Sequence, residues 1–259
     1  MKPINDRIKE YITTQQEEFE KLCSACTMNP ANNPQELWIC QELENGKKYE
    51  ACHQFQSFTV ESFNRDIPVV YYDSDLSNFR GLDNIKNEHG KPIDIFKVIH
   101  DKQNLYISGL NGTGKTHLSD GILKEIKFKN YIENQHDKYK YPLLNIFIIN
   151  ERDCFRRLQN QFELSEQFLI DIKNADLVVW SEFGKKKPSE FISDIVASAI
   201  DIIWESTKSG LTKPALIINT TLNVNDILER YADGGDIYSR FTDLFKGRFI
   251  YFKTISGRG

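Results

Sequence analysis

The sequence predicts an α/β fold in which helices flank a parallel sheet, preceded by a small cysteine-containing module at the N-terminus. Two observations support this prediction. From about residue 100, short apolar runs alternate with segments of helical character, a pattern typical of a parallel sheet that is covered on both faces. Before that point, four of the five cysteines of the chain gather in one loop-rich stretch.

The N-terminal part is expected to combine a helix with a metal site. Residues 4–22 are rich in Glu, Gln and Lys and carry apolar residues at roughly helical spacing, which predicts a short amphipathic helix. Residues 23–60 are loop-rich and cannot bury much apolar surface alone, so a bound metal would have to compensate. We therefore expect two domains, over residues 1–60 and residues 61–259.

The larger domain is expected to alternate strands and helices. Each apolar run predicts one buried strand, and the runs are Leu105–Ile107, Ile146–Ile149, Leu177–Trp180, Ala215–Ile218 and Phe249–Phe252. Helices are expected between them, over residues 115–127, 151–162, 188–207 and 224–231. The polar, lysine-rich stretch 127–141 is expected to form a surface loop.

Composition and charge exclude several classes of protein. No run of about 18 apolar residues is present, so no membrane span is expected. The first residues lack the apolar core of a secretory signal, which predicts a cytoplasmic protein with reduced thiols. With a net charge of −4, any contact with nucleic acid must be local or must depend on the assembly of several chains.

The strongest motif is Gly109-Leu110-Asn111-Gly112-Thr113-Gly114-Lys115-Thr116, which fits G-x-x-x-x-G-K-[ST] at every fixed position. It follows an apolar strand, and its glycines let the backbone wrap around phosphate groups at the start of a helix. The motif predicts a nucleoside triphosphate site, with Lys115 on the β- and γ-phosphates and the Thr116 hydroxyl on Mg²⁺. The expected nucleotide-binding residues are Gly109, Asn111, Gly112, Thr113, Gly114, Lys115, Thr116 and the adjacent His117.

A second motif is the apolar strand that ends in Trp180-Ser181-Glu182. Two acidic residues at such a strand end would place one carboxylate on Mg²⁺ and one on the attacking water. Here Ser181 takes the first place and only Glu182 remains. Asp176 lies at the other end of the strand, too far away to substitute. A serine hydroxyl is a neutral, weak ligand for a hard cation, so we expect Glu182 to act at a weakened magnesium site.

These motifs resemble those of the AAA+ ATPases that load replicative helicases, of the DnaC/DnaI type, and of the related IstB transposition helpers. The resemblance covers roughly residues 67–258 and opens at Ile67–Tyr72, a segment that lies near the adenine in the family. Ala215–Asn223 is similar to the family's sensor-1 strand, and the resemblance implies Thr221 as the γ-phosphate sensor, with Asn219 two residues earlier as the competing choice.

Two arginines take their expected roles from the same resemblance. Gly235–Arg240 is similar to the family's "RIYSR" box, which implies that Arg240 is a finger reaching the nucleotide of a neighbouring subunit. The closing segment Phe252–Arg258 is similar to the family's "F…SYR", which implies Arg258 as the sensor-2 arginine. With Lys115, Glu182 and Thr221, these arginines complete the expected catalytic set.

The resemblance implies an ATPase that loads a hexameric replicative helicase onto single-stranded DNA and forms a homo-oligomer when assembled on that helicase. Two other functions remain open. Because Ser181 replaces an acidic residue, the chain would also suit a nucleotide-gated adaptor with little hydrolysis. An IstB-like transposition helper shares the ATPase core, although helpers of that kind are not generally expected to carry the cysteine module.

The clustered cysteines favour a structural zinc site. Cys23 and Cys26 form C-x₂-C, a spacing that suits two thiolates on one tetrahedral Zn²⁺, and Cys40 and Cys52 complete a set of four. His53 competes as the fourth ligand, although the resemblance to loaders with an N-terminal zinc module favours Cys52. In those loaders, the module docks on the helicase. Cys154 is expected to be a core thiol.

Local basic charge marks where DNA would bind. Lys185-Lys186-Lys187 directly follows the Glu182 strand, and Arg240–Gly259 contains five basic residues against one acidic residue. The alternative to a DNA-binding role is that this short lysine run is simply a solvated surface loop. Repetition of such a patch in every subunit of an oligomer would make moderate local charge sufficient.

Overall fold

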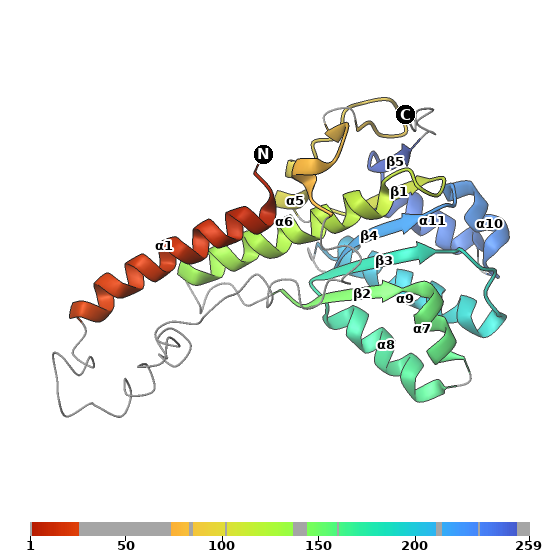
Figure 1. Cartoon of the computed structure of the whole chain (residues 1–259). Coiled ribbons are helices and arrows are strands. Elements are labelled where there is room, and N and C mark those ends of the chain that lie inside the picture. The colour runs from red at the N-terminus through yellow and green to blue at the C-terminus, as the bar shows by residue number, and fades with distance from the viewer. Residues whose placement is uncertain are drawn as a thin grey trace. The chain divides into compact units, whose positions relative to one another are not determined.

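The computed structural model of the chain describes residues 2–25, 74–82, 85–101, 103–136, 144–159, 161–210, 214–232 and 234–252 (Figure 1). It divides the chain into two units, Met1–Tyr72 and Asp73–Gly259, and each is described by itself. The domain boundary predicted at residues 60 and 61 lies outside the described residues, as does the segment Ile67–Tyr72.

Helix α1 (Ile4–Ala25) is the described element of the first unit. It begins after Pro3, whose carbonyl accepts hydrogen bonds from the N–H groups of Asp6 and Arg7 at 3.1 Å. Asp6 lies in the first turn, where a negative charge stabilises the helix dipole. The helix ends at Ala25 rather than at residue 22, so Cys23 lies within its last turn.

All the predicted strands form, and they pair in one five-stranded parallel sheet with the order β2-β3-β4-β1-β5. The strands are β1 (Leu105–Gly109), β2 (Ile146–Asn150), β3 (Leu177–Phe183), β4 (Ala215–Thr220) and β5 (Phe249–Phe252). Their apolar runs are continuous because both faces of a parallel sheet are covered. The carboxyl ends of all the strands meet at one edge, where polar residues near the ends of β3 and β4, Ser181 and Asn219, lie side by side.

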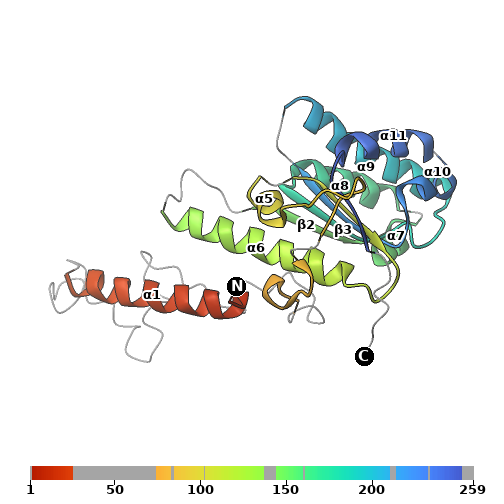
Figure 2. The ribbon, with the colours of Figure 1, turned by 90° about the horizontal axis from the view of Figure 1, so that it is seen from above.

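Helices cover both faces of this sheet. Figure 2 shows α6 on one side of it, and α8, α9 and α11 on the other. The helical elements of the second unit are η4 (Leu76–Asn78), α5 (Ile95–His100), α6 (Lys115–His136), α7 (Glu151–Leu158), α8 (Phe162–Asn174), α9 (Glu190–Lys208), η6 (Val224–Asp226), α10 (Ile227–Arg230) and α11 (Gly234–Leu244). In the described residues, no helix combines the length and the apolar character that a bilayer span requires.

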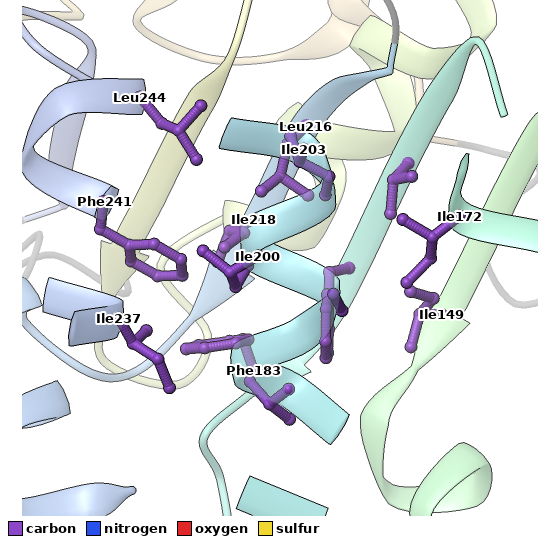
Figure 3. Close-up of a cluster of buried hydrophobic side chains, with 14 of the residues drawn as sticks. Ile149, Ile172, Phe183, Ile200, Ile203, Leu216, Ile218, Ile237, Phe241 and Leu244 are labelled. Atoms are coloured by element: carbon purple, nitrogen blue, oxygen red, sulfur yellow. The ribbon is translucent and has the colours of Figure 1, made fainter. Parts of the chain in front are cut away.

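The main core lies between the sheet and the helices α8, α9 and α11. Ile200 and Ile203 of α9 are buried close to Leu216 and Ile218 of β4 (Figure 3). Phe183, the last residue of β3, packs its ring 5.3 Å from that of Phe241 on α11. Burial of each such side chain contributes roughly 1.5–3 kcal/mol to stability. The end of β3 is therefore held in place by its packing against α11.

Two expectations about helices are wrong. The loop expected over 127–141 is helical up to His136, because its Lys, Glu and Gln residues favour helix and its Phe128 is buried. The helix expected over 151–162 ends at Leu158, and a further helix, α8, follows it. Neither glycine nor proline marks this break, so the sequence carries no clear signal for it.

Candidate functional site

The phosphate motif forms the predicted connection between a strand and a helix. β1 ends at Gly109 and α6 begins at Lys115. Gly112 and Gly114 have φ angles of 78° and 92°, a region that side chains with a Cβ avoid. Since the first turn of a helix leaves N–H groups without intrahelical acceptors, the loop and the helix start offer donors to an anion.

Lys115 is the first residue of α6, directly after this loop. Its side chain is buried, and Nζ donates a hydrogen bond to the carbonyl oxygen of Leu110 at 2.7 Å. Burial lowers the pKa of Lys115, and the neighbouring positive charge of Lys185 lowers it further. A phosphate bound in the loop would offset both effects, which is the arrangement expected of a phosphate-binding lysine.

Asn219 links β4 to the start of α6. It is buried, and its Nδ2 donates to Thr116 Oγ1 at 3.0 Å and approaches Ser119 Oγ at 3.3 Å. The pairing of β3 with β4 places Ser181 directly beside Asn219. A cation on the Thr116 hydroxyl would therefore lie near a neutral hydroxyl and an amide at this edge of the sheet.

Thr221, the residue implied as the γ-phosphate sensor, is exposed just beyond β4 and lines the same pocket as Asn219. Asn219 is the one that contacts Thr116, whereas Thr221 lies at the rim. Both alternatives thus stay within reach of a bound nucleotide. The residue between them, Thr220, is buried and accepts a hydrogen bond from the Leu222 N–H at 3.0 Å, which fixes the chain after the strand.

Glu182 enters the pocket through an irregularity of β3. The register of β3 against β4 shifts between Ser181 and Phe183, and Glu182 has a φ of 60°. It is the only non-glycine residue with positive φ in the described part of the chain. Trp180 and Phe183 remain in the core with rings 5.3 Å apart, so the bulge frees the carboxylate from the sheet. Such backbone strain is typical of functional sites.

Six of the eight expected nucleotide residues line one pocket of about 360 Å³, whereas Gly109 and Thr113 of the same loop do not. It is lined by Asn111, Gly112, Gly114, Lys115, Thr116, His117, Glu182, Lys185, Asn219, Thr220 and Thr221. The structure therefore brings together the phosphate loop, the end of β3 and the end of β4. In the described residues, no three carboxylate, imidazole or thiol side chains meet in a group that could hold a metal ion. A magnesium ion here would depend on Thr116 and on the phosphates of the nucleotide.

His117 fastens the segment before β1 to the phosphate loop. Its Nε2 lies 3.1 Å from the N–H of Asp75 and 2.6 Å from Oδ1 of Asn78. The imidazole also meets the ring of Phe79 edge to face, with 5.4 Å between the ring centroids. His117 thus lines the pocket, as expected, and also holds its wall.

Glu151 supports the turn after Glu182, and sequence reasoning missed it. This carboxyl is buried, and its Oε2 accepts hydrogen bonds from the Gly184 N–H at 2.9 Å and the Tyr231 hydroxyl at 3.3 Å. Burial raises the pKa of Glu151 to about 8. In a sequence, a glutamate at the start of a helix is expected to be exposed and to stabilise the helix dipole. Nothing in the sequence therefore distinguished Glu151 from an ordinary surface glutamate.

A second pocket, of about 590 Å³, adjoins the first. It contains five basic residues, Arg152, Arg156, Lys185, Lys186 and Lys187. Asp153 pairs with Arg156 at 3.4 Å, and the other acidic residue of the lining is Glu151 with its raised pKa. Ser189, the N-cap of α9, also lines it. We call this the basic groove. Lys185 lines both pockets.

Arg240 lies on α11, away from the nucleotide pocket of its own chain. It forms ion pairs with Asp201 of α9 and with Asp236, and its guanidinium lies 5.7 Å from the centre of the Trp204 ring. Its role toward a neighbouring subunit stays a prediction. Arg258 lies outside the described residues.

The zinc prediction falls largely outside the described residues. Cys23 belongs to α1, whereas Cys26, Cys40, Cys52 and His53 are not described. Cys154 on α7 packs against the core as expected, and burial raises the pKa of its thiol to about 11.

Comparison with known proteins gives matches among solved structures only. No family model and no curated protein matches the chain. The DnaC helicase loader is 18% identical, with a TM-score of 0.46 over 61% of this chain and 86% of that chain. DnaI is 16% identical, with a TM-score of 0.45 over 61% of this chain and 81% of that chain. AMPPCP-bound DnaA from Aquifex aeolicus is 14% identical, with a TM-score of 0.45 over 61% of this chain and 44% of that chain. At these identities, the likeness concerns the fold alone.

Proposed function

We propose that this chain is an ATP-dependent loader of a hexameric replicative helicase that acts on single-stranded DNA. The observation that carries the ATPase part of the proposal is the convergence of Lys115, Thr116 and Glu182 in one pocket. A phosphate-binding loop alone supports nucleotide binding. A carboxylate directed into the same pocket supports hydrolysis as well.

Each pocket residue would have its own role in ATP hydrolysis. The phosphates of ATP would lie against the N–H groups of the loop, and Lys115 would turn from the Leu110 carbonyl to the terminal phosphates. Glu182 would accept a proton from the attacking water. Asn219 orients the Thr116 hydroxyl that would hold Mg²⁺. When bound, magnesium stabilises the negative charge that develops on the phosphates.

Single-stranded DNA is assigned to the basic groove. Its cations, together with the N-terminus of α9, suit a phosphate backbone. Repetition of the groove in an oligomer, with Arg240 reaching the neighbouring nucleotide, would build a longer track. In the structure Arg240 pairs with Asp201 of its own chain, so a contact with a neighbouring nucleotide would compete with that ion pair.

Helicase docking is assigned to residues 1–60. Their cysteines Cys23, Cys26, Cys40 and Cys52 have the spacing of a structural zinc site. This part of the proposal rests on the sequence and on its resemblance to helicase loaders.

The proposal is tested on the full chain with Lys115→Ala. We expect the wild type to bind ATP, to hydrolyse it in the presence of single-stranded DNA, and to retain a purified replicative helicase in an ATP-dependent manner. Lys115→Ala removes the ammonium from the phosphates and is expected to lose all of these. A wild type that does not bind ATP would contradict the proposal, and ATP binding without helicase retention would contradict its loader part.

A nucleotide-gated adaptor is the second candidate, and Ser181 is the observation that favours it. Ser181 lies beside Asn219 where a carboxylate would strengthen the cation site. If the wild type binds ATP and retains helicase without turnover above Lys115→Ala, the adaptor function is the correct one. Ser181→Asp is then the informative variant in the same assay, because it restores the missing charge.

A further inference from the structure

Lys185 is the residue shared by the nucleotide pocket and the basic groove. In the nucleotide pocket, it lies near enough to Lys115 for its charge to lower the pKa of that residue. In the basic groove, it stands beside Lys186 and Lys187. Its side chain is about half exposed, at 47%, so it can exchange partners without disturbing the core.

In the structure, Lys185 is committed to Glu182. Its Nζ forms an ion pair with Oε1 of Glu182, and its backbone N–H donates to the Glu182 carbonyl at 3.1 Å. The Gly184 N–H between them is held by Glu151 at 2.9 Å. The strained turn is thus fixed by backbone contacts, while the ion pair depends on one flexible side chain. While it is formed, the ion pair takes up Oε1 of Glu182 and fixes how the carboxylate is turned, so the carboxylate cannot turn freely towards an attacking water molecule.

The basic groove offers Lys185 a competing partner. Phosphate oxygens form strong charge-assisted hydrogen bonds with ammonium groups. The neighbouring lysines and arginines would bring a phosphate close to Lys185 when single-stranded DNA lies in the groove. Because the pair with Glu182 is partly exposed to solvent, its contribution is small and a phosphate can displace it.

We propose that Lys185 is a positioning residue that withholds Glu182 from water while the basic groove is empty and releases it when a DNA phosphate binds there. This inference rests on the proposed function and adds a regulation to it. ATP hydrolysis would then be low in the free protein and stimulated by DNA through one side chain.

The test measures steady-state ATP turnover of the full chain with and without an oligothymidylate. We expect Lys185→Met to raise the rate without DNA by about two- to five-fold, the range set by removal of an exposed ion pair, and to lose most of the stimulation. Lys185→Arg keeps the cation and should keep the low rate. Lys173→Met, the same change at an exposed lysine of α8, is the matched control for the rate without DNA.

Several outcomes would overturn the inference. An unchanged rate for Lys185→Met without DNA would show that the pair restrains nothing. A lower rate with weaker binding of a fluorescent ATP analogue would make Lys185 a nucleotide ligand instead. ATP binding without turnover in every variant would also contradict a restraint of Glu182 by Lys185, while leaving nucleotide binding intact. If the wild type binds no ATP at all, the proposed function fails first. Unfolding temperatures equal to that of the wild type exclude a merely structural effect.

Discussion

Asn219 is the side chain that ties the end of β4 to the start of α6. Its amide donates to Thr116 Oγ1 at 3.0 Å, so it decides how that hydroxyl is oriented. On the neighbouring strand, the carboxylate of Glu182 is held by an ion pair with Lys185. At this scale, the chemistry of the pocket is set by residues that hold the expected catalytic groups rather than by those groups alone.

Asn219→Ala is expected to lower ATP turnover by about ten-fold, because loss of a group that orients a metal ligand typically costs ten- to a hundred-fold. The Mg²⁺ concentration for half-maximal activity should rise, while ATP binding falls less. Turnover measured against Mg²⁺ concentration checks this. Asn225→Ala, an exposed amide in η6, is the control and should behave as wild type. Equal magnesium dependence of both variants would refute this role of Asn219.

At the scale of elements, the packing of α11 against α10 depends on the absence of a side chain at one residue. α11 carries Arg240 and begins with two adjacent glycines, Gly234 and Gly235. A Cβ at Gly234 would lie 2.5 Å from the carbonyl oxygen of Ile227 and 2.6 Å from that of Leu228, both on α10, whereas a Cβ at Gly235 would meet nothing within 4 Å. The close approach of the two helices therefore requires glycine at residue 234 but not at residue 235.

Gly234→Ala should destabilise the protein by about 1–3 kcal/mol, since the backbone of α10 must move to admit the methyl group. Gly235→Ala should leave the unfolding free energy unchanged or raise it by up to about 1 kcal/mol, because alanine restricts the unfolded chain. Urea unfolding of both variants measures the difference. Equal effects at the two positions would show that α10 and α11 do not pack so closely.

Buried carboxyl groups govern how the stability of the whole molecule responds to pH. Burial raises the pKa of Glu151 to about 8 and that of Asp120 on α6 to about 7. Both groups therefore bind protons more tightly in the folded than in the unfolded protein. The stability they favour is complete below the unfolded pKa values and is lost as the pH rises through the folded ones.

The unfolding free energy is thus expected to fall between about pH 3.8 and pH 7 for Asp120 and between about pH 4.5 and pH 8 for Glu151, by at most about 1.4 kcal/mol per pH unit for each group. Glu151→Gln keeps an oxygen for the Gly184 N–H but cannot titrate, so its curve should fall less steeply. Urea unfolding at several pH values compares the two. Glu229→Gln, an exposed residue of α10, is the control. Equal slopes for Glu151→Gln and wild type would contradict the assignment.

Local patterns were enough to predict the sheet and most of the pocket. The apolar runs specify strands because each is continuous along the chain, and the phosphate loop is one uninterrupted motif whose backbone requirements select its glycines. The six pocket-lining residues between Asn111 and His117, all but Thr113, follow directly from it. The start of α6 at Lys115 was predicted correctly, but its extension to His136 was not, because a polar, lysine-rich sequence fits a loop as well as a helix. The break before α8 was missed because no glycine or proline marks it.

Contacts between distant parts of the chain could not be inferred in this way. Asn219 meets Thr116 across 103 residues of sequence, and Glu151 holds Gly184 across 33. Whether a glutamate is buried or an asparagine reaches a hydroxyl depends on which strands become neighbours and on where β3 bulges. The sequence therefore specifies the phosphate-loop motif and the strands beside it. The packed fold decides which distant side chains meet at that loop, because burial and strand pairing depend on the whole chain.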